Sequence, residues 1–283
     1  MTLHHHAEAL AARLPPLLVA AERVAATVAQ GVHGRRRTGS GETFWQFRRY
    51  QQGDPATAID WRQSARSQPV FVRETEWEAA QTVWLWADPS PSMAWRSTPD
   101  LPEKREHALL LILALAALLL RGGERVAPLS GALPPTTGGG ALARLAAVLM
   151  GESMADLPTP PLPRHATVVL IGDFLAPLEE MEAAVRRLAA AGAMGHLLQV
   201  LDPAEEALPY RGRVRFSGLE GEGETLVRRV DDVREAYAVR LQAHRDGLAA
   251  IARAAGWSFA LHHTDQPPQA ALLALHAALG GGR

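Results

Sequence analysis

Residues 82–92 read TVWLWADPSPS. The first six residues, 82–87, are rich in valine and tryptophan and predict a β-strand. Asp88 follows at once, and two prolines alternate with two serines after it, which predicts a tight loop at the strand's end. The run therefore joins an apolar strand to a carboxylate and two hydroxyls at alternate positions.

The pattern of strand followed by helix continues to the end of the chain. Strands are expected at 82–87, 125–129, 166–171, 196–201 and 257–262. Helices are expected at 103–121, 140–150, 178–191, 233–255 and 269–279. Strands that alternate with helices of this length predict an α/β domain with a mostly parallel central sheet and helices on both faces.

Two further segments precede this domain, which we place at 81–283. Residues 1–30 form a helical segment that Pro15 and Pro16 are expected to interrupt. Residues 31–80 are expected to form a small β-rich subdomain, with short strands near 59–61 and 69–72. A hairpin with a glycine-rich turn is expected near 211–230, as an insertion in the α/β domain.

Composition excludes several classes of protein. The net charge of −1 gives no overall field that would attract nucleic acid or a membrane surface. The chain has no cysteine, so disulfides and thiolate zinc sites are excluded. The most apolar stretch, 109–120, falls well short of the ~20 residues that span a bilayer. With no apolar run near residue 1 that would serve as a secretory signal, we expect a cytoplasmic protein without membrane insertion.

Two of the predicted strands end in acidic residues. Asp88, Ser90 and Ser92 follow the first, and Asp173 follows strand 166–171. Ligands of parallel sheets bind beyond the carboxyl ends of the strands, and hard oxygen donors suit Mg²⁺ or Mn²⁺. The alternative is that the aspartate and the serines only cap the following helix or build a turn.

The order Asp88-x-Ser90-x-Ser92 resembles the metal-ion-dependent adhesion site of von Willebrand factor A domains. The block before it contains RYQQGD (49–54), IDWRQSAR (59–66) and FVRETE (71–76). This block is very similar to the signature of the domain of unknown function 58 family, in which it precedes a von Willebrand factor A-like domain. The resemblance covers roughly residues 30–200.

The resemblance implies a bacterial or archaeal protein-interaction or adaptor module rather than an enzyme. Proteins of the family are associated with MoxR-type AAA+ ATPases and are thought to act in complex assembly or maturation, so a MoxR-type partner and an unknown client protein are expected. Asp88, Ser90, Ser92 and Asp173 match the metal site, and Thr137, or else Thr136, would supply a further hydroxyl. The order of these threonines and the following glycines departs from the usual pattern, so a scaffold with a vestigial metal site stays open as an alternative.

The sequence gives less support to two other functions, nucleic-acid binding and catalysis. Nucleic-acid binding would use the arginines and aromatic residues of 35–73, although acidic residues balance the chain's charge. Catalysis is not expected, because the sequence lacks the Gly-x-Ser-x-Gly, phosphate-loop and His-Glu-x-x-His motifs. The charged residues of the block are instead expected to form a structural network of ion pairs. They are Arg49, Asp54, Asp60, Arg66 and Glu74.

Overall fold

The computed structural model describes residues 3–32, 44–52, 54, 56–66, 69–75, 81–152 and 156–281. The chain divides into two compact units. The larger unit combines Met1–Gly34 with Gln81–Arg283, and the smaller unit is Arg35–Ala80.

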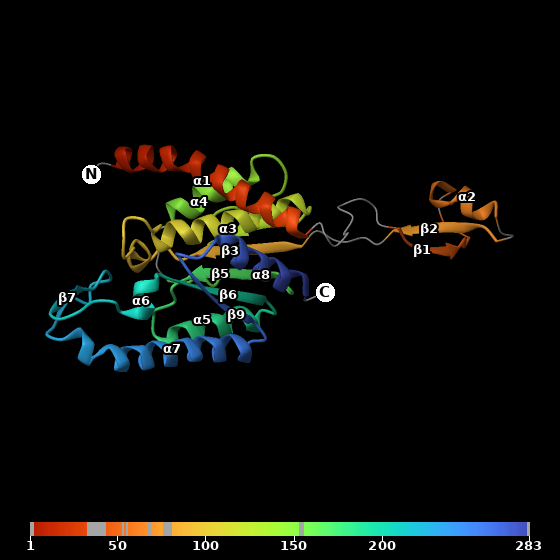
Figure 1. Cartoon of the computed structure of the whole chain (residues 1–283). Helices are drawn as coiled ribbons and strands as arrows, with labels where there is room; N and C mark the ends of the chain where they lie inside the picture. The colour runs from red at the N-terminus through yellow and green to blue at the C-terminus, as the bar shows by residue number, and fades with distance from the viewer. Residues whose placement is uncertain are drawn as a thin grey trace. The chain divides into compact units, whose positions relative to one another are not determined.

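A five-stranded sheet forms the centre of the larger unit (Figure 1). Its strands lie in the order β4-β3-β5-β6-β9, and every neighbouring pair is parallel. The expected parallel sheet is therefore confirmed. The strands are β3 (Thr82–Ala87), β4 (Arg125–Pro128), β5 (Thr167–Gly172), β6 (Met194–Leu201) and β9 (Ser258–His263).

Helices cover both faces of this sheet, as the alternation predicts (Figure 1). Successive side chains of a strand point to opposite faces. In β3, Val83 and Leu85 accordingly join one apolar core and Trp86 joins the other. The first core packs under α1 (Leu3–Val32), α3 (Lys104–Arg121), α4 (Ala141–Gly151) and α8 (Pro268–Gly281), and the second under α5 (Leu178–Ala190) and α7 (Arg234–Ala254).

Helix α1 differs from its prediction in two respects. It runs through Pro15 and Pro16 without ending, so the expected interruption is wrong. It also belongs to the larger unit rather than standing as a separate segment. Beyond the prolines, Ala21 and Ala25 are fully buried in the core that α1 shares with α3. Tertiary packing of an apolar helix face offsets the backbone hydrogen bonds that prolines remove.

The smaller unit contains an antiparallel pair, β1 (Phe44–Arg49) and β2 (Phe71–Thr75). A 3₁₀ turn (Ala56–Ala58) and the short helix α2 (Trp61–Ser64) lie between the strands. The strand expected at 59–61 does not form, and only Ile59 makes a single bridge to β2. The reason is that the Asp60 side chain accepts the backbone N–H of Gln63 and starts helix α2 at the next residue.

The charged network expected in this unit takes a different form. Asp54 pairs with Arg48 rather than Arg49, through two hydrogen bonds of 3.0 and 2.9 Å to the guanidinium. The side chain of Glu74 lies outside the described residues. Arg48, at least, is therefore engaged within the chain and is less available to a nucleic-acid phosphate.

The remaining elements lie between β6 and α7 or after β3. The expected hairpin is confirmed as β7 (Val214–Ser217) and β8 (Glu224–Val227). Helix α6 (Pro203–Ala207) was not expected, although a capping box of Asp202 and Glu205 marks its start. Short 3₁₀ turns occupy Pro91–Met93 and Val230–Asp232. No helix in the described part of the chain has the length and apolar character needed to cross a bilayer.

The connections of β3 and β5 create a topological switch point at the carboxyl edge of the sheet. The chain leaves β3 for α3 on one face, and it leaves the adjacent β5 for α5 on the other face. Such a switch point is where open α/β sheets bind their ligands. It brings Asp88 and Asp173 together.

Candidate functional site

The loop after β3 presents its side chains in a compact arrangement. Asp88 and Ser90 are both only 7% exposed. The Asp88 Oδ1 atom accepts the backbone N–H of Ser90 at 2.9 Å, which folds the loop back on itself. The Ser90 and Ser92 Oγ atoms then lie 3.0 Å apart. The three oxygen donors predicted from the sequence therefore lie in one loop, and the turn hydrogen bond expected under the alternative interpretation is also present.

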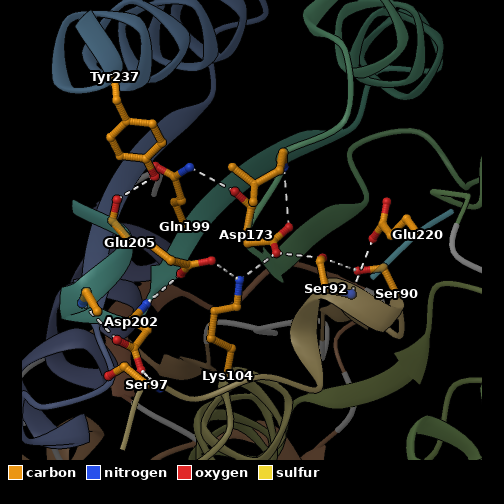
Figure 2. A network of polar contacts seen from close by, with 12 residues as sticks. Ser90, Ser92, Ser97, Lys104, Asp173, Gln199, Asp202, Glu205, Glu220 and Tyr237 are labelled. Carbon is orange, nitrogen blue, oxygen red and sulfur yellow. Dashed lines mark hydrogen bonds and ion pairs between the residues drawn. The ribbon is translucent and has the colours of Figure 1, made fainter. Parts of the chain in front are cut away.

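Asp173 joins this loop from the neighbouring strand. Its Oδ2 atom accepts a hydrogen bond from the Ser92 hydroxyl at 2.7 Å (Figure 2). Gly172 permits the close approach, because a Cβ atom there would lie 2.7 Å from the Cβ of Asp88. The structure thus brings together four of the five predicted site residues: Asp88, Ser90, Ser92 and Asp173.

The fifth predicted ligand, Thr137, is not part of this cluster. Thr136 bridges in antiparallel fashion to Val126 in β4, which pairs with Val83 in β3. Val83 lies five residues before Asp88, or about 16 Å along an extended strand. The chain has therefore already turned back from the carboxyl edge at Thr136, and Thr137 follows it away from the site. The loop between β4 and the threonines reverses direction, which the sequence did not reveal.

A buried lysine completes the cluster and was missed as a site residue. Lys104, the only lysine of the chain, is the first residue of α3 and is 1% exposed. Its Nζ atom lies 2.8 Å from the Asp173 Oδ2 atom and 2.6 Å from the Glu205 Oε1 atom (Figure 2). Burial alone would lower the pKa of Lys104, but the charges of the two carboxylates outweigh it and raise that pKa above its ordinary value. The lysine is therefore a fixed ammonium.

Glu205 is held in place by its own helix. It is the third residue of α6, and its Oε2 atom accepts the backbone N–H of Asp202 at 2.8 Å. Burial raises the pKa of Glu205, against the opposing effect of the Lys104 charge. Its backbone carbonyl accepts a hydrogen bond from the Tyr237 hydroxyl at 2.5 Å. Sequence reasoning counted only two strands that end in acids. The third, β6, is followed by Asp202 and the capping box that carries Glu205.

The charged form of the Asp88 carboxyl group is disfavoured in the folded chain. Its pKa is raised from 3.8 to about 6, first by burial and then by the negative charge of Asp173. Glu220 adds a smaller contribution of the same sign. A positive ion beside Asp88 would relieve this penalty, so the electrostatics of the loop favour a cation.

The hairpin β7–β8 brings this last carboxylate over the site. Glu220 lies in the turn between the two strands, and its Oε1 atom accepts the Ser92 backbone N–H at 3.4 Å (Figure 2). A cleft of about 960 Å³ lies beside it, between the hairpin, α6 and α7. Ser92 and Glu205 line the cleft together with mainly apolar side chains, so the cluster forms its polar end.

The donor set fits a hard divalent cation in part. Among the described residues, no group of three or more histidine or acidic side chains has a metal-binding arrangement. A cation would therefore depend on the Asp88 carboxylate and the hydroxyls of Ser90 and Ser92, with water completing its coordination. Asp173 would support it indirectly, since its Oδ2 atom is already bonded to Ser92 and Lys104.

A family model described as "Protein of unknown function DUF58" matches residues 46–247. The chain belongs to the DUF58 family. The membership predicted from the block at 49–76 is thus confirmed, and the match continues through four of the five strands of the sheet and most of α7, with only β9 beyond its end. It includes the whole polar cluster around Lys104.

Two kinds of relative accompany this family match. Uncharacterized proteins of Mycobacterium tuberculosis and Mycobacterium bovis are 28% identical to this DUF58 chain, over 91% of it and 86% of their own length. Among solved structures, BatB of Bacteroides thetaiotaomicron has a TM-score of 0.42 and an aerotolerance-related membrane protein of Bacteroides fragilis has 0.41. Each is 16% identical and is covered completely, against 71% of this chain.

Proposed function

We propose that this DUF58 protein is a cytoplasmic, non-enzymatic adaptor whose domain is of the von Willebrand factor A type. The observation that carries the proposal is the cluster at the switch point, where Asp88, Ser90 and Ser92 converge beside Asp173. Side chains that match an adhesion-type site along the sequence are thus also neighbours in space. A binding surface at this edge is the function that the arrangement supports best.

In this proposal the cluster holds Mg²⁺ or Mn²⁺. Asp88, Ser90 and Ser92 would bind the ion directly, and Asp173 would orient the Ser92 hydroxyl. When bound, the ion supplies a Lewis-acidic position that a carboxylate of a partner protein can fill. Lys104 fixes the side chain of Asp173 and so determines where the Ser92 oxygen points.

Thermal unfolding with and without Mg²⁺ or Mn²⁺ tests this metal role. A ligand that binds only the folded state at a hundredfold excess over Kd raises stability by about 2.7 kcal/mol. We expect the rise in the wild-type chain and its loss in Asp88→Ala/Ser90→Ala. Thr137→Ala is the matched control and should keep the rise. Histidines 4–6 are deleted in all three proteins to remove stray metal binding.

The partner proposed from the family resemblance is a MoxR-type AAA+ ATPase, which would act with this adaptor on a client protein. The test is direct binding between the purified chain and the MoxR-type ATPase of the same organism, in Mg²⁺ and in EDTA. Binding that is lost in EDTA and in Asp88→Ala supports the adaptor role. Equal binding in both buffers would contradict a role for the metal in recognition.

The second candidate is a scaffold whose metal site is vestigial. Its support is Lys104, since a protein cation already neutralises Asp173 and contacts Glu205. A metal-independent scaffold predicts that saturating Mg²⁺ and Mn²⁺ leave the unfolding temperature of the wild-type chain unchanged. The thermal experiment therefore separates the two candidates.

A further inference from the structure

We propose that the cleft beside the hairpin is the docking groove for a partner segment with one acidic side chain flanked by apolar ones, and that Glu220 occupies the acidic position until the partner arrives. The inference rests on the proposed interaction role and names the chemistry of the partner. It assigns a function to the β7–β8 hairpin and to its turn, which meets the cluster through the contact of Glu220 with Ser92.

The acidic position is identified by a contact already present in the chain. The Glu220 carboxylate accepts the backbone N–H of Ser92, 128 residues away in sequence, beside two hydroxyls that suit a cation. The contact is 3.4 Å long and exposed, so a better-placed carboxylate can replace it.

The apolar positions are identified by the cleft. Half-buried Val214 and Phe216 point inward from β7, and Trp95 and Leu208 add further apolar surface. Leu219, next to Glu220, remains 48% exposed although it lines the same cleft. A groove of about 960 Å³ lies within the size range of ligand sites and accommodates several apolar side chains.

Charge on the walls favours the same occupant. Arg215 and Arg240 both line the cleft and are exposed. Arg215 makes a long surface ion pair, 3.4 Å from its Nη1 atom to the Glu224 Oε2 atom. Two guanidinium groups beside an apolar groove favour a segment of net negative charge and steer its approach.

The structure of the β7–β8 hairpin allows a partner carboxylate to replace Glu220. Its outward residues are exposed, and Leu226 on β8 is 45% exposed. An isolated two-stranded hairpin that buries little apolar surface opens at low free-energy cost. Movement of the turn would free the Ser92 N–H and open the end of the groove in a single step.

Peptide selection tests the proposal without knowledge of the natural partner. A display library of random 12-residue peptides is selected on the full chain in Mg²⁺, and enriched peptides are measured by fluorescence anisotropy. We expect enriched peptides to carry aspartate or glutamate between apolar residues. Phe216→Ala should weaken their binding roughly tenfold, because it removes an aromatic wall of the groove.

The matched pair Glu220→Ala and Glu224→Ala tests the internal competitor. Both changes remove one carboxylate from the hairpin, but only Glu220 contacts Ser92. Removal of the competitor should tighten peptide binding by about fivefold, since less of the protein is in the closed state. Glu224→Ala only frees Arg215 from its exposed ion pair, so it should tighten binding by much less than Glu220→Ala does.

Three outcomes would overturn the inference: no enriched peptide, enriched peptides without an acidic residue, or peptide affinities that neither Phe216→Ala nor Glu220→Ala changes. A Mg²⁺-dependent thermal shift together with any of these would reject the groove and leave the metal site standing. Peptide binding that depends on Phe216 and Glu220 but not on Mg²⁺ would keep the groove and reject the metal.

Discussion

Replacement of Lys104 by methionine removes the ammonium from the centre of the cluster and keeps the length of the side chain. Lys104 is 1% exposed, and its partners Asp173 and Glu205 have side chains that are 3% and 17% exposed. Loss of one partner of a buried ion pair typically costs 3–5 kcal/mol, because the other charge stays buried without compensation. We expect Lys104→Met to lower the free energy of unfolding by about 3 kcal/mol at pH 7.

Urea unfolding followed by tryptophan fluorescence measures this loss. Arg121→Met, at the exposed end of the same helix α3, is the matched control and should change stability by less than about 0.5 kcal/mol. Addition of Asp173→Asn and Glu205→Gln to Lys104→Met should recover most of the loss, because no buried charge is then left alone. A loss below about 1 kcal/mol in Lys104→Met would refute the reasoning.

Three further predictions follow from the site and the core. In EDTA, the raised pKa of Asp88 means that the folded state binds this proton more tightly than the unfolded state, so the contribution of Asp88 to stability falls by about 3 kcal/mol as pH rises from about 4 to about 6. Urea unfolding across this range should show that the stability of Asp88→Asn relative to the wild-type chain rises by this amount. Burial, aided by His262, lowers the pKa of His107 to about 4, so the contribution of His107 to stability changes in the opposite direction and falls by about 3 kcal/mol as pH falls from 6.5 to 4; the stability of His107→Gln relative to the wild-type chain should rise by this amount over the same range. Gly172→Ala should destabilise the chain by 1–3 kcal/mol and abolish any thermal shift by Mg²⁺, because the new Cβ would lie 2.7 Å from the Cβ of Asp88; an unchanged shift would contradict the packing at this position.

The fold could be predicted from sequence where the signal was local. The run at 82–87 and the run at 166–171 are apolar strands that end in an aspartate, and both formed as expected. The order of the strands was not predicted, because it depends on which face each helix covers. Helix α1 was misjudged for a related reason, since the burial of Ala21 and Ala25 against α3 is a tertiary effect that no local proline rule includes.

The site was predictable only as far as neighbours in sequence and strand ends could show. Asp88, Ser90 and Ser92 are adjacent in one loop, and Asp173 followed from the rule that parallel strands end at a common edge. Lys104, Glu205 and Glu220 reach this cluster over sequence separations of 69, 101 and 128 residues. The one lysine of the chain, at the start of a predicted helix, was the visible signal for Lys104.

Charge balance connects the lysine, the cation and the hairpin. The cluster holds four carboxylates and one ammonium, that of Lys104, which contacts Asp173 and Glu205. Three negative charges therefore remain when Asp88, Asp173, Glu205 and Glu220 are all ionised. A divalent ion at Asp88 would reduce this excess to one. Exchange of Glu220 for a partner carboxylate would then leave the charge of the site unchanged, so the exchange is governed by packing in the apolar cleft. Phe216→Ala should therefore weaken peptide binding more than an increase in the salt concentration does.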